Sequence, residues 1–227
     1  MAMTCITGCA TKSTRLGAIG DAMNRPLSRI LAMGALAVAL AGCNQVYSTR
    51  PLFTAADEAG APAMKPGIWL LAKADCTFDE ALPVKQWPKC ADWVVVRPGQ
   101  ILSPDSAEGE EQRWSVIETL LARGEPRVLQ WREPEKADDH WAYAGVASRG
   151  TDAGGSIVEI EAWPAMCGPP PPDDATSKVS AQPLPGLVID GQDCLASDAE
   201  PVRASAAASR TWSPEHQVAH WVRDAPP

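Results

Sequence analysis

Short runs of β-branched and aromatic residues, separated by turns that contain Gly or Pro, dominate the chain from residue 67 to residue 190. The clearest run is 156–163, SIVEIEAW, in which Glu159 and Glu161 alternate with Val158, Ile160 and Ala162. This period of two is typical of a strand with one buried face and one wet face. A turn at 152–155, DAGG, connects it to a strand-like run at 140–148. Hairpins of this kind predict a mainly β chain.

The order of the predicted elements indicates a curved sheet with a helix after it. We expect strands at 67–71, 92–97, 100–102, 113–122, 128–131, 140–148, 156–163 and 187–190. A helical spacing also fits 113–122. A capping box at Ser197 and Glu200, followed by an Ala-rich stretch, predicts a helix over 198–210. The segment 214–223 fits a last strand or a short helix. The predicted fold class is mainly β (α+β): an antiparallel curved sheet or small barrel of about eight strands with one C-terminal helix.

The N-terminal segment has the features of a secretory signal. Arg25 and Arg29 precede an apolar run, Ile30 to Leu40, of 11 residues. A membrane-spanning helix needs ~20 residues, so this run reads as a secretory signal. Its end, Leu40-Ala41-Gly42-Cys43, resembles the lipobox of bacterial lipoproteins. In that class the chain is cut before the Cys, which then carries the lipid. An ordinary signal peptide with a chance Cys is the alternative.

The resemblance to lipoproteins also implies a location. In Gram-negative bacteria an Asp after the lipidated Cys favours the inner membrane, whereas this chain has Asn44. We therefore expect a lipid anchor on Cys43 in the cell outer membrane, facing the periplasm. Residues 1–22 lack signal character, so we expect translation to start at Met23; a long n-region is the alternative. The expected division is a signal peptide at 23–42, a lipidated Cys with a flexible tether at 43–65, and a single domain at 66–227.

Charge limits the partners of the mature chain. From residue 44 onward, 27 Asp and Glu stand against 16 Lys and Arg, a formal charge of −11. This balance argues against nucleic acid, and against an anionic lipid surface, as a direct partner. The remaining 185 or so residues are enough for one domain with a single core.

Cysteine usage predicts two disulfides. The chain has seven Cys; Cys5 and Cys9 lie in the removed segment, and Cys43 is the lipid site. The remaining four are Cys76, Cys90, Cys167 and Cys194. An even set in an oxidising compartment favours disulfides. We expect the local pairing Cys76–Cys90 and Cys167–Cys194, because each pair closes a short loop between strand-like segments. A Cys₄ zinc site is the rival, but no C-x₂-C pair is present.

Tryptophan is enriched, with 9 Trp against 2 Phe and 2 Tyr. Large aromatics most often fill a core, and a ligand-lining role is the alternative. The candidates for lining a ligand site are Trp69, Trp93, Trp131 and Trp141. Gly67-Ile68-Trp69 together with the element order is similar to lipocalins, which open with Gly-x-Trp, continue with seven up-and-down strands and end with a helix and a strand. This resemblance implies a cavity for a small apolar ligand, with Arg203 as the late basic residue.

The sequence assigns no catalytic residue, metal or cofactor. It contains no G-x-S-x-G elbow, no P-loop and no dinucleotide fingerprint. His216 and His220 would share one face of a helix, but on a strand they would lie ~13 Å apart, too far for one metal ion. We therefore predict a non-enzymatic periplasmic binding or structural module of the cell envelope, with a protein or a small apolar ligand as partner. An enzyme that uses His216 or His220 is the alternative, and it requires one of them beside a buried carboxylate.

Overall fold

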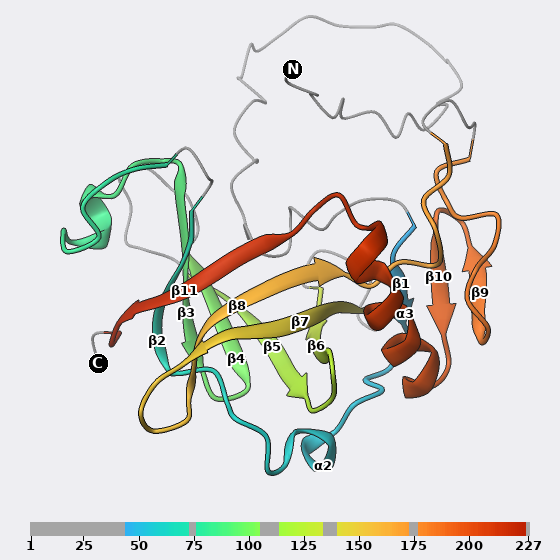
Figure 1. The fold of residues 1–227 in the computed structure, drawn as a ribbon, viewed down its shortest axis with the longest axis horizontal. Helices are drawn as coiled ribbons and strands as arrows, with labels where there is room; N and C mark the ends of the chain where they lie inside the picture. Colours follow the sequence, from blue (N-terminus) through green and yellow to red (C-terminus); the bar gives the residue numbers. More distant parts are fainter. Residues whose placement is uncertain (1–43, 73–75, 105–113, 134–139, 173–176, 226–227) are drawn as a thin grey trace, which may run out of the picture. The chain divides into compact units, whose positions relative to one another are not determined.

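Eight antiparallel strands close into a barrel in the computed structural model, which describes residues 44–72, 76–104, 114–133, 140–172 and 177–225 (Figure 1). Seven of them follow in chain order, and each pairs with the next. They are β2 (Gly67–Ala72), β3 (Ala91–Arg97), β4 (Gln100–Pro104), β5 (Trp114–Ala122), β6 (Arg127–Arg132), β7 (Trp141–Thr151) and β8 (Ile157–Pro164). The eighth, β11 (Gln217–Arg223), lies between β8 and β2 and closes the ring. The predicted mainly β barrel is confirmed.

Closure depends on a strand that comes after the helix. Helix α3 (Ala199–Trp212) precedes β11. The segment 214–223, for which the sequence fits either a strand or a short helix, therefore contains a strand. The lipocalin plan has seven strands between the Gly-x-Trp strand and the helix. Here six barrel strands follow β2 before the helix. The strand after the helix, β11, is the eighth strand of the barrel.

A small sheet extends the barrel from one side of β7. It consists of β1 (Val46–Ser48), β10 (Asp193–Ala196) and β9 (Leu187–Asp190). β1 pairs antiparallel with β7 and parallel with β10, and β9 forms a hairpin with β10 and is the outer edge. Neither β1 nor β10 was predicted, because each has four residues or fewer and gains its partners from distant parts of the chain.

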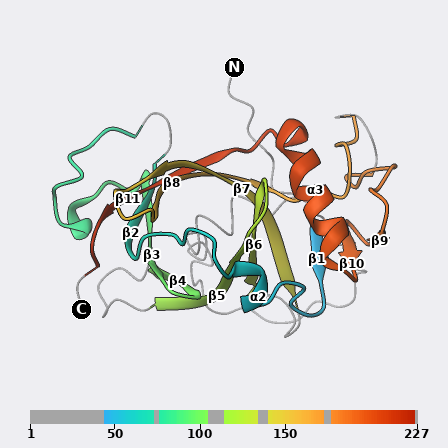
Figure 2. The same ribbon diagram turned by 60° about the horizontal axis from the view of Figure 1, so that its bottom comes forward.

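Helix α3 packs on the outside of the barrel, on the side of β1 and β10 (Figure 2). Its buried face includes Val202 and Ala206. Trp163 of β8 lies beneath it, fully buried, and its indole N–H donates a hydrogen bond to the Ala206 carbonyl at 2.7 Å. Gly145 makes room for this ring, since a Cβ there would lie 2.4 Å from the Trp163 indole nitrogen. The helix is thereby locked to the barrel wall.

The barrel interior is an apolar core of inward-facing side chains. Trp69 is fully buried and Trp131 is 5% exposed. The strands β7, β8 and β11 contribute small residues to the same core: Ala142, Ala144, Ala162 and Ala219. Bulky rings from β2 and β6 thus share the barrel interior with small side chains from other strands.

The segment 44–65, expected to be a flexible tether, is part of the fold. Val46 and Phe53 are 1% and 2% exposed. The side chain of Gln130 accepts hydrogen bonds from the amides of Leu52 and Phe53 at 2.8 and 2.9 Å. The prediction was wrong because the small polar composition of this segment conceals two buried residues, whose amides donate to the Ala165 carbonyl and to the Gln130 side chain.

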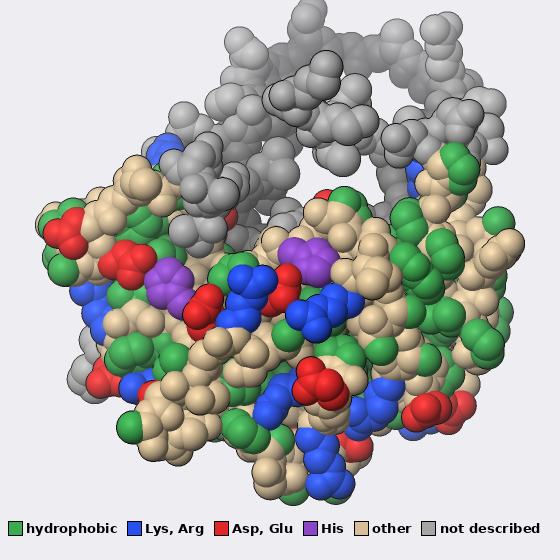
Figure 3. All heavy atoms as spheres, in the orientation of Figure 1, with side chains coloured by type: hydrophobic (Ala, Val, Ile, Leu, Met, Phe, Trp, Pro, Cys, Tyr) green, Lys and Arg blue, Asp and Glu red, His purple; other side chains and the backbone are tan. Residues whose placement is uncertain are grey.

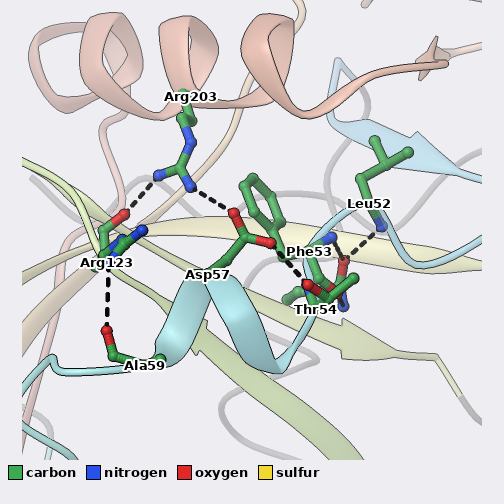
Figure 4. A network of polar contacts seen from close by, with 8 residues as sticks. Leu52, Phe53, Thr54, Asp57, Ala59, Arg123 and Arg203 are labelled. Atoms are coloured by element: carbon green, nitrogen blue, oxygen red, sulfur yellow. Dashed lines mark hydrogen bonds and ion pairs between the residues drawn. The ribbon is translucent and has the colours of Figure 1, made fainter.

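The short helix α2 (Ala55–Glu58) fixes the same segment at a second place (Figure 4). Asp57 accepts hydrogen bonds from the Thr54 amide at 2.9 Å and from Arg203 of α3 at 3.3 Å. The Arg203 guanidinium also lies over the Phe53 ring, 4.7 Å from its centre. These contacts tie the N-terminal segment to α3.

The loop between β2 and β3 covers the outer face of the barrel. The described part of this loop, from residue 76 onward, contains the 3-10 turn η1 (Val84–Gln86). Val84 and Trp87 pack on Ile68, Val95 and Leu102, whose side chains point away from the interior. The predicted signal segment 23–42 and the predicted lipid site Cys43 lie outside the described residues.

Candidate functional site

Glu161 is the centre of a polar cluster on the outer wall of the barrel. Ile160 and Ala162, its neighbours on β8, belong to the interior core, so the Glu161 side chain points outward. Its carboxylate nevertheless is only 11% exposed. It lies 2.8 Å from His216, 3.1 Å from Arg149 and 3.2 Å from Arg210. The cluster therefore joins β7, β8, α3 and the residue just before β11.

His216 uses both ring nitrogens within this cluster. Nδ1 lies 2.8 Å from Glu161 Oε1, and Nε2 lies 3.0 Å from the carbonyl oxygen of Arg210. A carboxylate and a carbonyl both accept, so both bonds form together only when the ring is an imidazolium. The ring also stacks on Trp163, with centroids 5.6 Å apart and planes inclined by 22°. Both ring nitrogens of His216 thus face acceptor oxygens.

The surroundings of Glu161 favour its ionised form. Burial by itself raises the pKa of this carboxyl, but hydrogen bonds from His216 and Arg149 outweigh that effect. The Arg210 guanidinium adds to them, and the net result is a lowered pKa. His216 thus lies beside a buried, ionised carboxylate, which is the condition that the enzyme alternative requires.

His220 belongs to a different pair. Its Nε2 lies 3.1 Å from Oε1 of Glu80, in the loop between β2 and β3. Arg223 donates to the carbonyl oxygens of Ala81 and Leu82 in the same loop, at 3.2 and 2.6 Å. Figure 3 shows histidines among acidic and basic side chains on one face of the molecule. His216 and His220 each contact a different carboxylate, Glu161 and Glu80 respectively. Among the described residues no group of three or more potential metal ligands gathers.

The four tryptophans expected to line a ligand site do not come together. Trp69 and Trp131 lie in the barrel interior. Trp93 lies on the outer face, edge-on to Trp87 and Trp114. Trp141 belongs to the outer cluster beneath α3 and β1. Arg203, the late basic residue, contacts Phe53 and Asp57. Of the four rings, only the two interior ones share a core, and within the described residues the Trp131 indole nitrogen is buried without a hydrogen-bond partner.

The structure shows a second polar group that the sequence did not reveal. Tyr47 of β1 stacks on His140, with ring centroids 4.4 Å apart, and its hydroxyl donates a short hydrogen bond to Asp190. Burial, followed by the bond to Asp190, raises the pKa of Tyr47 to about 12. His140 Nε2 lies 3.2 Å from Oε2 of Glu133. No local pattern marks these residues, because β1 becomes a strand only through its distant partners.

The two predicted disulfides are confirmed with their predicted pairing. Cys76–Cys90 closes the loop between β2 and β3, and Cys167–Cys194 joins the segment after β8 to β10.

Comparison with known proteins adds no relative: no family model, curated protein or solved structure matches the chain. Within the part of the chain that the structure describes, no helix is long and apolar enough to cross a membrane.

Proposed function

We propose that this protein is an outer-membrane lipoprotein, anchored by a lipid on Cys43, whose barrel is a non-enzymatic binding or structural module in the periplasm. The Leu40-Ala41-Gly42-Cys43 motif supports the anchor. The two disulfides support an oxidising compartment, since cytosolic thiols are kept reduced. An envelope protein is the partner that this proposal favours.

The placement of both His216 ring nitrogens against acceptor oxygens is the observation that supports the non-enzymatic part. A general base needs a free lone pair within reach of the proton that it removes. Here Nδ1 and Nε2 of His216 both face acceptors, and the three donors around Glu161 occupy its carboxylate. The cluster links four elements of the fold, so its effect is to hold the barrel wall, the helix and the closing strand together.

Two measurements in intact cells test the proposal. The mass of the N-terminal peptide reports whether residue 43 carries acyl chains, and Cys43→Ala is the matched control. A photo-crosslinking amino acid at Val116, which is 56% exposed on the outer barrel wall, tests for a partner. The same probe at Thr211, exposed on α3, is the positional control. One dominant crosslinked complex at Val116 is expected; a purely monomeric product at both positions would refute the protein-partner function.

A carrier of a small apolar ligand is the second candidate. The observation that favours it is the closed barrel with Trp69 and Trp131 inside and the Trp131 indole N–H buried without a partner among the described residues. An eight-stranded barrel either fills its interior with side chains or holds one small ligand. Titration with fatty acids is expected to change Trp emission, and Trp131→Phe is expected to reduce the change. An unchanged spectrum at saturating fatty acid would end this candidacy.

A further inference from the structure

Asn44, the first residue after the predicted lipid site, is fixed in the fold on all sides. Its backbone N–H donates to the Gln192 carbonyl at 2.6 Å, and its carbonyl accepts from the Cys167 amide at 2.8 Å. Its side chain donates to Gly168 at 3.2 Å and accepts from the Ser180 amide at 2.8 Å. The residue is 1% exposed and has a φ of 78°, a conformation that Asn tolerates.

This placement leaves no slack between an anchor and the domain. Consecutive α-carbons across a trans peptide are about 3.8 Å apart, so a lipidated Cys43 begins within that distance of a buried residue. Acyl chains on Cys43 enter the bilayer, and Asn44 must then lie at the bilayer surface. We propose that the anchor holds the β9–β10 hairpin directly against the membrane, so that a phospholipid bilayer is the partner of this surface. The inference rests on the lipidation proposed above.

The hairpin is the element next to the anchor. β1 and β10 are parallel, with Val46 opposite Cys194, so both begin at the same end. The bond from Asn44 to Gln192 places the anchor beside the turn that connects β9 to β10. Ile189 pairs with Cys194, so it lies two strand spacings from Val46, or about 9.6 Å. Apolar groups of interfacial elements are buried ~5–10 Å into the headgroup region, so exposed aliphatic side chains close to the anchor are the groups that would enter it.

The side chains of β9 suit a bilayer surface. Val188 and Ile189 are 65% and 45% exposed, and as neighbours on a strand they point to opposite faces of the hairpin. Each face of the β9–β10 hairpin therefore carries one exposed apolar side chain close to the turn. Both are large aliphatic groups on the outer edge of the sheet, where no further strand covers them among the described residues.

Electrostatic attraction does not bring the β9–β10 hairpin to the bilayer, and the acidic side chains near its turn do not strongly oppose contact with the bilayer. The carboxylate of Asp190 accepts from the Tyr47 hydroxyl, and that of Asp193 accepts from the Gln45 amide at 3.0 Å. Both acidic groups near the turn are thus directed to partners in the protein. The formal charge of −11 on the mature chain excludes electrostatic attraction to anionic lipids, so the contact follows from the anchor and the apolar side chains.

Hydrogen exchange on an anchored protein tests the proposal without depending on the cell. The mature chain from Cys43 is secreted in unlipidated form, which leaves Cys43 as its one thiol outside the disulfides. A maleimide phospholipid is coupled to that thiol, and the protein is placed on vesicles of phosphatidylcholine and phosphatidylethanolamine. The matched control carries a twelve-residue Gly-Ser linker between residues 43 and 44, with a typical span of about 19 Å.

Amides of residues 187–192 are expected to exchange about tenfold more slowly in the directly anchored protein than in the linker control. V188D/I189D is expected to remove this protection, whereas V116D, on another exposed strand face, is expected to keep it. Equal exchange at 187–192 with and without the linker would overturn the inference. Protection that grows with the density of protein on the vesicle would also overturn it, because the occupant would then be a second copy pairing through β9. The N-terminal mass from cells reports separately on lipidation, so failure of the proposed function is distinguishable.

Discussion

Replacement of Glu161 by Gln is expected to destabilise the barrel by removing the charge that three donors share. Arg149 and Arg210 are 46% and 49% exposed, so each contributes as a surface pair, about 0.2–1 kcal/mol. His216 is 28% exposed and forms the shortest bond, which we take as about 1 kcal/mol. Gln also directs an NH₂ group at donors. The expected loss is therefore about 2 kcal/mol, or roughly 4–8 °C in Tm for a chain of this length.

The lowered pKa of Glu161 predicts the direction in which its contribution to stability changes with pH. The folded-state pKa of Glu161 is lowered, so its contribution is present above the ordinary value of 4.5 and is lost as pH falls through the lowered pKa. Thermal unfolding followed by circular dichroism should show the full Tm difference at pH 7 and a shrinking one in acid. Glu159→Gln, at the next outward position of β8, is the matched control and should shift Tm by less than about 2 °C. A variant that matches wild type at pH 7, or a difference that persists unchanged in acid, would refute the reasoning.

Three further outcomes are expected. Burial, the largest cause for both residues, raises the pKa of Tyr47 and Tyr143 to about 12, so neither of the two tyrosines should ionise below pH 11 in an absorbance titration of the folded protein. Their contribution to stability is complete below pH 10 and is lost as pH rises toward 12, so normal titration near pH 10 without unfolding would contradict their burial. Asn44→Ala should lower the free energy of unfolding by about 3 kcal/mol in urea titrations. The loss for Asn44→Gly should be about 1 kcal/mol smaller than that for Asn44→Ala, because Gly tolerates the positive φ. Equal losses for the two variants would exclude a backbone effect. Gly67→Ala should cost about 3 kcal/mol, because its Cβ would lie 2.4 Å from the Arg223 carbonyl oxygen on the closing strand and φ is +139°; a wild-type Tm would contradict that packing.

Local pattern was enough to predict most of the barrel. The alternation in 156–163 and the β-branched run at 92–97 lie within one residue of β8 and β3. The Ala-rich helix and the two disulfide pairings were also found, because helix propensity and short loops act over short distances. The predicted capping box at Ser197 and Glu200 was wrong: the helix begins after Asp198, and the Ser197 hydroxyl donates to the Asp198 carboxylate. What the sequence missed depends on distant partners. β1 gains its hydrogen bonds from β7 and β10, about a hundred residues or more away, and the supposed tether is held by Gln130.

The candidate site shows the same division between local and distant information. The sequence pointed to both residues, to Glu161 as part of a wet strand face and to His216, together with His220, as a candidate for metal binding or acid–base chemistry. Their 2.8 Å contact spans 55 positions and exists only because β11 pairs with β8, with Val218 opposite Glu161. No spacing rule joins them, since the helix between them sets the distance. Tyr47 and His140, likewise, stack across a strand pairing that short-range patterns do not contain.

The position of β11 has a consequence for how the chain reaches its folded state. Its seven residues supply the pairing for both β2 and β8, and the partners on β2 lie about 150 positions earlier. A chain delivered to the periplasm from its N-terminus would therefore emerge as an open sheet with two unpaired edges, and unpaired edges are templates for pairing with other chains. Such a chain would depend on holding factors until its final strand arrives. Loss of that strand by truncation would turn a closed molecule into an aggregation-prone one.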